Sequence, residues 1–160
     1  MAAANKPIKR SAALATLSRE HHEALLLVWK IKNGLKNRIE LGRITSYCQW
    51  FWQHYLDHHF KQEEKVLVPF LGIGSPLSSR LFTEHAAIKA LITSLSAGPD
   101  IALLESLATT LNDHVRFEER ILFNAVESLA TPEQLKEIGN ALIEEKEAHF
   151  WEDEFWISSK

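Results

Sequence analysis

Four segments of the 160-residue sequence carry an apolar helical repeat in which one position of the apolar face is a histidine. The apolar residues recur every three or four positions, which is the spacing of one face of an α-helix. The histidines are His21, His59, His85 and His114. A core that receives an imidazole from each of four helices must satisfy those groups there, because burying a polar group without a partner is costly.

Two of these histidines have a glutamate one helical turn later, as His59 with Glu63 and His114 with Glu118. Residues four apart lie on the same face of a helix, so both glutamates also point inward. The expected inward stripes are Leu14, Leu17, His21, Leu25 and Val28; Cys48, Trp52, Tyr55, His59, Glu63 and Val66; Leu81, His85, Ile88, Ile92 and Leu95; and Leu104, Leu107, Leu111, His114, Glu118, Ile121 and Ala125.

Capping residues and prolines divide the chain into helices. The expected helices run from a Ser18 cap to about Gly34, from about Arg43 to Val68 before Pro69, from Ser75-Pro76 to before Gly98, from an Asp100 cap to about Leu129, and onward from Thr131, with Gln134 at capping-box spacing. No segment shows the sustained two-residue alternation of a strand. The sequence therefore predicts an all-α fold, an up-down antiparallel four-helix bundle with an extra C-terminal helix.

The expected organisation is a flexible N-terminal arm at 1–12, the bundle at 13–130, and a C-terminal helix with an aromatic and acidic tail at 131–160. The net charge of −3, without a basic block, argues against nucleic acid as a partner. No apolar run approaches the about 18 residues of a membrane span, and no signal peptide is recognised, so a cytoplasmic location without membrane binding is expected. The single cysteine, Cys48, excludes an internal disulfide.

Buried imidazoles and carboxylates together indicate a metal centre. A histidine and a glutamate about 5–6 Å apart at Cβ can reach adjacent ions, and a carboxylate from each of two helices can bridge them. This mixture of ligands suits iron best, with zinc, manganese and copper as weaker candidates. The pattern therefore predicts two metal ions inside the bundle.

The segments 17–21, 59–64, 84–85 and 114–119 resemble hemerythrin-like HHE cation-binding domains, over roughly residues 14 to 127. The resemblance implies a four-helix bundle with two non-haem iron ions, Fe²⁺ or Fe³⁺, and a bridging oxo or hydroxo group. It further implies that His21 and His59 ligate one iron and His85 and His114 the other, with Glu63 and Glu118 as bridges. Zinc or manganese are the expected substitutes.

The chain departs from the oxygen-carrying members of this family at two positions. They have two histidines one turn apart on the third helix, whereas here Lys89 follows His85 by four residues and Leu81 precedes it by four. They also place an aspartate five residues after the fourth-helix histidine, where this chain has Glu119. We therefore expect open metal positions, which favour sensing, O₂ reduction or peroxide handling over reversible transport.

The function that the resemblance implies is binding of O₂ or a related small diatomic ligand, for storage, sensing or delivery. One alternative is a di-iron oxidase, a peroxidase or a repair protein for nitrosative damage. A second alternative is an iron-responsive sensor or interaction module. All three use the same ligands, so whether the protein is an enzyme stays open, and no catalytic residue is assigned.

Residues beside the predicted ligands leave further choices. His21 is preferred over His22 as the first-helix ligand on helical phase. We expect His22, His58, Tyr55 and Trp52 to line the pocket or to contact the metal ligands. Surface positions are expected for Glu20, Glu64, Glu84 and Glu119, and a non-ligating position for His149. Glu119 is also the alternative bridging carboxylate, although it lies off the apolar stripe.

The segment 148–157 mixes aromatic and acidic residues. We expect it to be a helix end that docks Phe150, Trp151 and Phe155 on the bundle. The alternative is an exposed aromatic patch that joins copies of the chain into a homo-oligomer or binds another partner.

Overall fold

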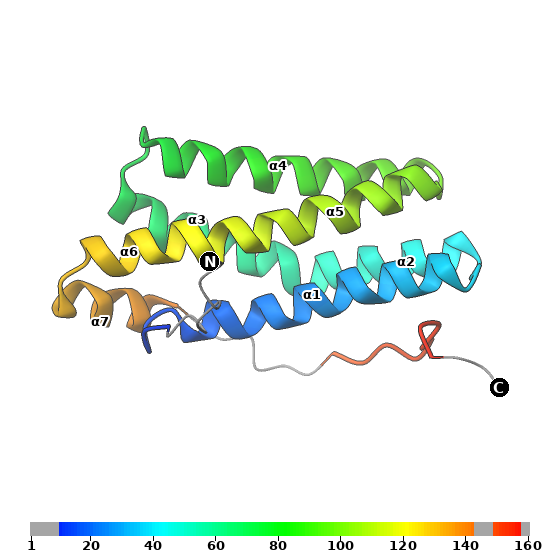
Figure 1. Ribbon diagram of the computed structural model, residues 1–160, viewed down its shortest axis with the longest axis horizontal. Coiled ribbons are helices and arrows are strands. Elements are labelled where there is room, and N and C mark those ends of the chain that lie inside the picture. The colour runs from blue at the N-terminus through cyan, green and yellow to red at the C-terminus, as the bar shows by residue number, and fades with distance from the viewer. Residues whose placement is uncertain (1–9, 143–148, 158–160) are drawn as a thin grey trace, which may run out of the picture.

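The computed structural model describes residues 10–142 and 149–157, and the elements within them are helical, with no strand (Figure 1). The α-helices are α1 Ala15–Lys36, α2 Leu41–Phe51, α3 Asp57–Leu71, α4 Pro76–Ala97, α5 Ile101–Phe117, α6 Phe123–Leu129 and α7 Pro132–Ala141. A π-helical segment, Trp52–Leu56, joins α2 to α3, and another, Glu118–Leu122, joins α5 to α6. With the π-helical segments counted in the helices they continue, the described residues form four long helices and a short fifth, which confirms the predicted bundle.

Three of the expected helix starts have the predicted caps. Ser75 Oγ accepts a hydrogen bond from Ser78 N at 3.2 Å, and an Asp100 carboxylate oxygen accepts one from Leu103 N at 3.0 Å. Thr131 and Gln134 form the predicted capping box at the start of α7. Each cap satisfies a backbone N–H that has no partner within its helix.

Two expected boundaries were wrong. The first helix begins at Ala15, and Ser18 lies inside it and donates its hydroxyl hydrogen bond to Glu119 at 2.7 Å. The second long helix continues through Pro69 to Leu71. A proline in the last turn removes one helical hydrogen bond near an end that frays, so the helix closes two residues later.

The π-helical segments change which residues face the core. Each inserts an extra residue into the helix and rotates the following face by about 100°. Beyond Glu118 the predicted inward residue Ile121 is therefore 46% exposed, while Leu122 is fully buried. Before His59 the predicted inward residues Trp52 and Tyr55 are only half-buried. Leu25 was also assigned wrongly, at 39% exposure; its neighbours that are buried instead are Ala24 and Leu27.

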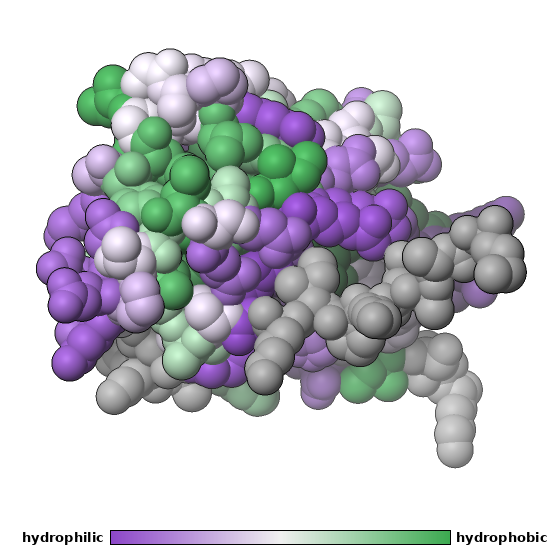
Figure 2. Space-filling model, turned by 60° about the vertical axis from the view of Figure 1, so that its left-hand side comes forward, coloured by the Kyte–Doolittle hydropathy of each residue, from purple (hydrophilic) through white to green (hydrophobic). Residues whose placement is uncertain are grey.

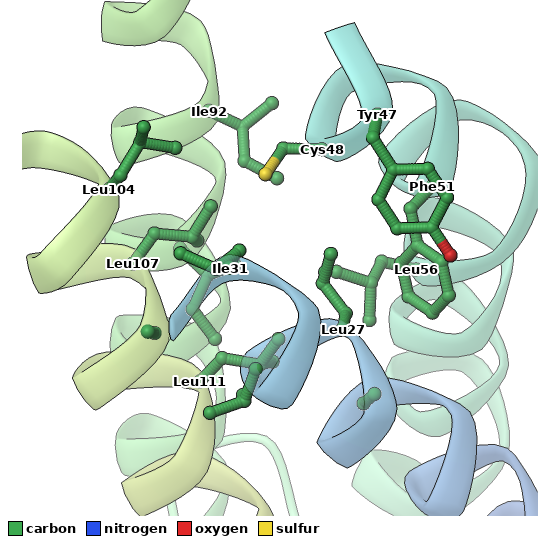
Figure 3. Packing of buried hydrophobic residues seen from close by; sticks show 14 of the residues in the cluster. Leu27, Ile31, Tyr47, Cys48, Phe51, Leu56, Ile92, Leu104, Leu107 and Leu111 are labelled. Atoms are coloured by element: carbon green, nitrogen blue, oxygen red, sulfur yellow. The ribbon is translucent and has the colours of Figure 1, made fainter. Parts of the chain in front are cut away.

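The buried apolar residues form two clusters. The larger joins the C-terminal half of α1, α2, the C-terminal half of α4 and the N-terminal half of α5, and includes Leu27, Cys48, Ile92 and Leu107 (Figure 3). The smaller joins the N-terminal parts of α1 and α4 to α3, α6 and α7. The predicted histidines lie along their helices between these clusters, so a polar layer divides the core.

The tail 149–157 lies along the bundle without helical structure. Phe155 is 2% exposed and packs in the larger cluster, where Gly34 makes room: a Cβ on Gly34 would lie 3.0 Å from Phe155 Cε2. Arg43 binds Asp153 at 2.6 and 2.8 Å. Trp151 is half-buried, but Phe150 is 80% exposed, so its predicted docking was wrong. The homo-oligomer contact through this tail stays a prediction.

The outer surface is mixed in polarity. On the face shown in Figure 2, hydrophobic side chains gather in a patch that hydrophilic ones surround. Among the described residues, no helix is long and apolar enough to span a bilayer.

Phe155→Ala should lower the free energy of unfolding by about 3 kcal/mol, because it leaves a cavity in the core where the tail docks. Phe150→Ala is the matched control, since that ring is 80% exposed and its removal should change stability little. Urea denaturation of both variants measures the difference. Equal midpoints for the two variants would show that the tail adds nothing to the core.

Candidate metal centre

Six side chains from four helices meet in the polar layer. They are His21 from α1, His59 and Glu63 from α3, His85 from α4, His114 from α5, and Glu118 at the start of the following π-helical segment. Two groups of four have potential ligand atoms within 4.8 Å of one another, and Glu63 and Glu118 belong to both. One group adds His21 and His59, and the other adds His85 and His114. The structure thus brings together the residues that the resemblance assigned to two ions with shared carboxylates.

These side chains are buried without hydrogen-bond donors for their inner atoms. The four histidines are at most 5% exposed and the two glutamates are fully buried. The Nε2 atoms of all four histidines and both carboxylate oxygens of each glutamate have no hydrogen-bond partner. Eight unsatisfied acceptors at one place would cost many kcal/mol of stability, and cations that bind them remove that cost. The residues therefore fit a metal centre.

The outer nitrogen of each histidine has a carboxylate partner. The Nδ1 contacts are His21 with Glu119 at 3.0 Å, His59 with Glu20 at 3.0 Å, His85 with Glu64 at 3.3 Å, and His114 with Glu84 at 2.8 Å. A carboxylate can only accept, so Nδ1 carries the proton and donates it, and this assignment follows from the hydrogen-bond network. The lone pair of each neutral imidazole then lies on Nε2 and points into the cluster. A carboxylate that accepts a hydrogen bond from the outer nitrogen fixes the orientation of a metal-binding histidine.

The four outer glutamates, named here the carboxylate ring, link the helices in a closed order. Glu20 on α1 reaches α3, Glu64 on α3 reaches α4, Glu84 on α4 reaches α5, and Glu119 after α5 returns to α1. The expectation that these residues are surface charges was wrong. Each lies next to an inward position in sequence and therefore about 100° around its helix, where it faces the neighbouring helix.

The inner atoms face one another as acceptors. His59 Nε2 lies 3.3 Å and His85 Nε2 lies 3.2 Å from Glu63 Oε1, and His21 Nε2 lies 3.5 Å from Glu118 Oε1. With Nδ1 protonated, neither atom of such a pair has a hydrogen to share. A positive charge between them, a proton or a metal ion, is needed to make the contact favourable.

Without a bound cation, burial and neighbouring charges shift the pKa values of the clustered side chains in opposite directions. Burial lowers the pKa of His21 and of His114, and nearby carboxylates do not fully offset it. Burial also acts against protonation of His59, but the charge of Glu63 and the hydrogen bond to Glu20 outweigh it and raise its pKa to about 10. Desolvation likewise opposes ionisation of Glu63, yet His59 and His85 hold its pKa well below the usual range.

The charge around the centre is strongly negative. Six carboxylates belong to the cluster and the carboxylate ring, and two guanidiniums bind that ring: Arg10 with Glu119 at 3.1 Å and Arg80 with Glu84 at 2.7 Å. Arg10 also binds Glu127 at 2.7 Å, so its positive charge is shared between two carboxylates. An excess of carboxylates in a buried site favours the binding of cations.

Other residues predicted near the centre are placed differently. His22 is exposed, so His21 is the histidine that α1 contributes. Tyr55 donates its hydroxyl hydrogen bond outward to the carbonyl of His149 at 3.4 Å. His58 is half-buried and outside both groups. Trp52 lines a pocket that also contains His85.

The positions one turn from His85 supply no further ligand. Lys89 is exposed, and Leu81 is fully buried but apolar. The predicted departure from the oxygen carriers is therefore present in the folded chain as well as in its sequence. Among the described residues, each group has two histidines and the shared pair of glutamates.

Comparison with known proteins gives one match. The family model for the hemerythrin HHE cation-binding domain matches residues 12–126, most of the chain and all six clustered residues. No curated protein and no solved structure matches the chain in the corresponding searches. The match and the buried His/Glu groups that could hold metal agree, and the chain belongs to the hemerythrin HHE cation-binding family.

Proposed function

We propose that this protein holds two iron ions in the polar layer and binds O₂ or a related small diatomic ligand there, for storage, sensing or delivery. The observation that carries the proposal is the convergence of eight buried acceptor atoms, none of which has a hydrogen-bond partner. His21 and His59 would hold one ion and His85 and His114 the other. Glu63 and Glu118 would be shared.

Iron fits this ligand set because imidazole nitrogen with carboxylate oxygen is typical of non-haem iron sites. When bound, iron would supply electron transfer and open coordination positions, which no side chain of this chain offers. The side chains of this chain would orient the ligand atoms and exclude water from the centre. The carboxylate ring keeps each Nε2 lone pair directed inward, and the two apolar clusters on either side keep water out.

The second candidate function is turnover of O₂ or peroxide on the same centre, and one observation favours it. The ligand that oxygen carriers have one turn from the third-helix histidine is missing, since Lys89 is exposed. Fewer protein ligands leave more positions for exchangeable groups. Storage and turnover are separated by whether the optical change on adding O₂ reverses.

Protein purified without oxygen should contain about two iron ions per chain, as the paired groups imply. Admission of O₂ should produce new near-ultraviolet and visible absorption bands. Reversal of these bands under vacuum over many cycles would support storage, and steady O₂ consumption would support turnover. Protein that contains only zinc, or folds fully with no metal bound, would contradict the iron centre.

Glu63→Ala and Glu118→Ala should each lose at least one of the two metal ions, because each carboxylate belongs to both ligand groups. Metal analysis of the purified variants measures this loss. Glu105→Ala is the control, since Glu105 is an exposed glutamate on α5 outside the cluster. If both cluster variants retained two ions, the shared carboxylates would be misassigned.

Glu20→Ala should weaken metal binding by about 10–100-fold, because His59 loses the acceptor that fixes its tautomer and ring orientation. Glu23→Ala, an exposed glutamate on the same helix, is the control. Competition against a chromophoric chelator gives both affinities. An equal affinity in the two variants would mean that the carboxylate ring does not support the metal ligands.

A further inference from the structure

Arg10, five residues before α1, binds the helical turn that follows α5. Its guanidinium group donates a hydrogen bond to the backbone carbonyl of Glu119 at 2.6 Å and lies 3.1 Å from the Glu119 carboxylate. It also binds the Glu127 carboxylate at 2.7 Å and the side-chain carbonyl of Asn124 at 3.2 Å, both on α6. The Arg10 side chain is only 8% exposed. One buried side chain therefore joins the segment before α1 to the π-helical segment and to α6.

Apolar packing holds the other end of this short segment. Leu14 is fully buried in the smaller apolar cluster. Ala13 lies against α7, where the absence of a side chain makes room: a Cβ on Gly139 would lie 3.1 Å from Ala13 Cα. The segment 10–14, named here the N-terminal clasp, is therefore anchored by Arg10 at one end and by Leu14 at the other.

The N-terminal clasp touches the groups that fix the ring of His21. Glu119 accepts the Nδ1 hydrogen of His21 at 3.0 Å, and the Ser18 hydroxyl donates to the same carboxylate at 2.7 Å. The Arg10 guanidinium carbon lies 5.4 Å from the centroid of the Phe123 ring. That ring stacks on His21 with centroids 5.2 Å apart and an interplanar angle of 7°. Arg10 thus contacts both neighbours of this imidazole.

A second arginine binds the carboxylate ring in a different way. Arg80 reaches Glu84 at 2.7 Å, but both residues lie on α4 and the Arg80 side chain is 50% exposed. Exposed pairs within one helix contribute little, because solvent screens them. The buried fork of Arg10 instead holds a carboxylate and a carbonyl of one residue together, which fixes the side chain relative to its backbone. The support of His21 therefore comes from a segment outside the bundle.

We propose that Arg10 is a positioning residue for the metal position of His21 and His59, and that the N-terminal clasp acts on this position through Glu119. The inference rests on the proposed metal centre. Without the guanidinium fork, Glu119 can turn away from Nδ1, and the Nε2 lone pair of His21 is no longer held toward the centre. The two ligand groups, alike in composition, then depend on different parts of the chain.

Zinc binding tests the positioning role, because imidazole and carboxylate bind zinc well. Arg10→Met should weaken the binding of one of two zinc ions by about three- to tenfold, less than the loss of a hydrogen-bond acceptor itself causes. Arg10→Lys keeps the charge without the fork and should show a smaller loss in the same direction. Arg43→Met is the matched control, since it removes a guanidinium that ties the tail to the bundle through Asp153. Affinities in Arg10→Met and Arg10→Lys equal to those of the control would overturn the proposal.

A double-mutant cycle tests the route through Glu119. Glu119→Ala should weaken zinc binding by about 10–100-fold, because His21 loses the acceptor of its Nδ1 hydrogen. Addition of Arg10→Met to Glu119→Ala should then cause less than about a twofold further loss, since residues that act in series are not additive. Additive losses would overturn the route.

A metal-free measurement separates this inference from the metal centre itself. Nitrogen-15 spectra of the histidine rings show which ring nitrogen carries the proton. In metal-free protein His21 should carry it on Nδ1, and Arg10→Met should distribute it over both nitrogens while His85 stays unchanged. This change in a protein that takes up no iron would keep the role of Arg10 and refute the iron centre. Two bound irons, with the His21 spectrum and the zinc affinities unchanged in Arg10→Met, would do the reverse.

Discussion

The structure depends on the contact between imidazole and carboxylate lone pairs at the centre of the bundle. His85 Nε2 and Glu63 Oε1 lie 3.2 Å apart, and His21 Nε2 lies 3.5 Å from Glu118 Oε1. Such a contact is unfavourable unless a proton or a metal ion lies between the two atoms. Metal ions bound between these atoms would make the contact attractive, and their binding free energy would add to the free energy of folding.

The apolar clusters and the carboxylate ring position the residues of this layer in different ways. The clusters fix the distances between helices by close packing, which is stiff to small displacements. The ring fixes the rotation of each imidazole through one hydrogen bond that comes from the adjacent helix. Glu20, Glu64, Glu84 and Glu119 each connect two helices, so the orientation of each histidine depends on its own helix and on a neighbouring one. The centre is therefore positioned by pairs of helices.

The helices and the six clustered residues could be predicted, because a polar residue at an apolar position of a helical repeat has to face the core. The periodicity failed where the helix departs from it: the π-helical segments moved Ile121 out and Leu122 in, and a regular repeat cannot anticipate an inserted residue. The carboxylate ring was missed because a residue beside a stripe is normally solvated. A usable signal was present, since each of the four helices carries a glutamate directly adjacent to an inward ligand position.

The surface pocket between α3 and α4 that His85 and Lys89 line lies at the same turn of α4 as the missing third-helix ligand. A histidine one turn after His85 would have to turn its ring inward, whereas Lys89 leaves this turn open to solvent and adds a positive charge. On the other side of the centre, His21 stacks on the fully buried Phe123, with centroids 5.2 Å apart, and Glu119, which accepts from its Nδ1 at 3.0 Å, lines another surface pocket. The two ligand groups therefore share their carboxylates, and each has a pocket beside it.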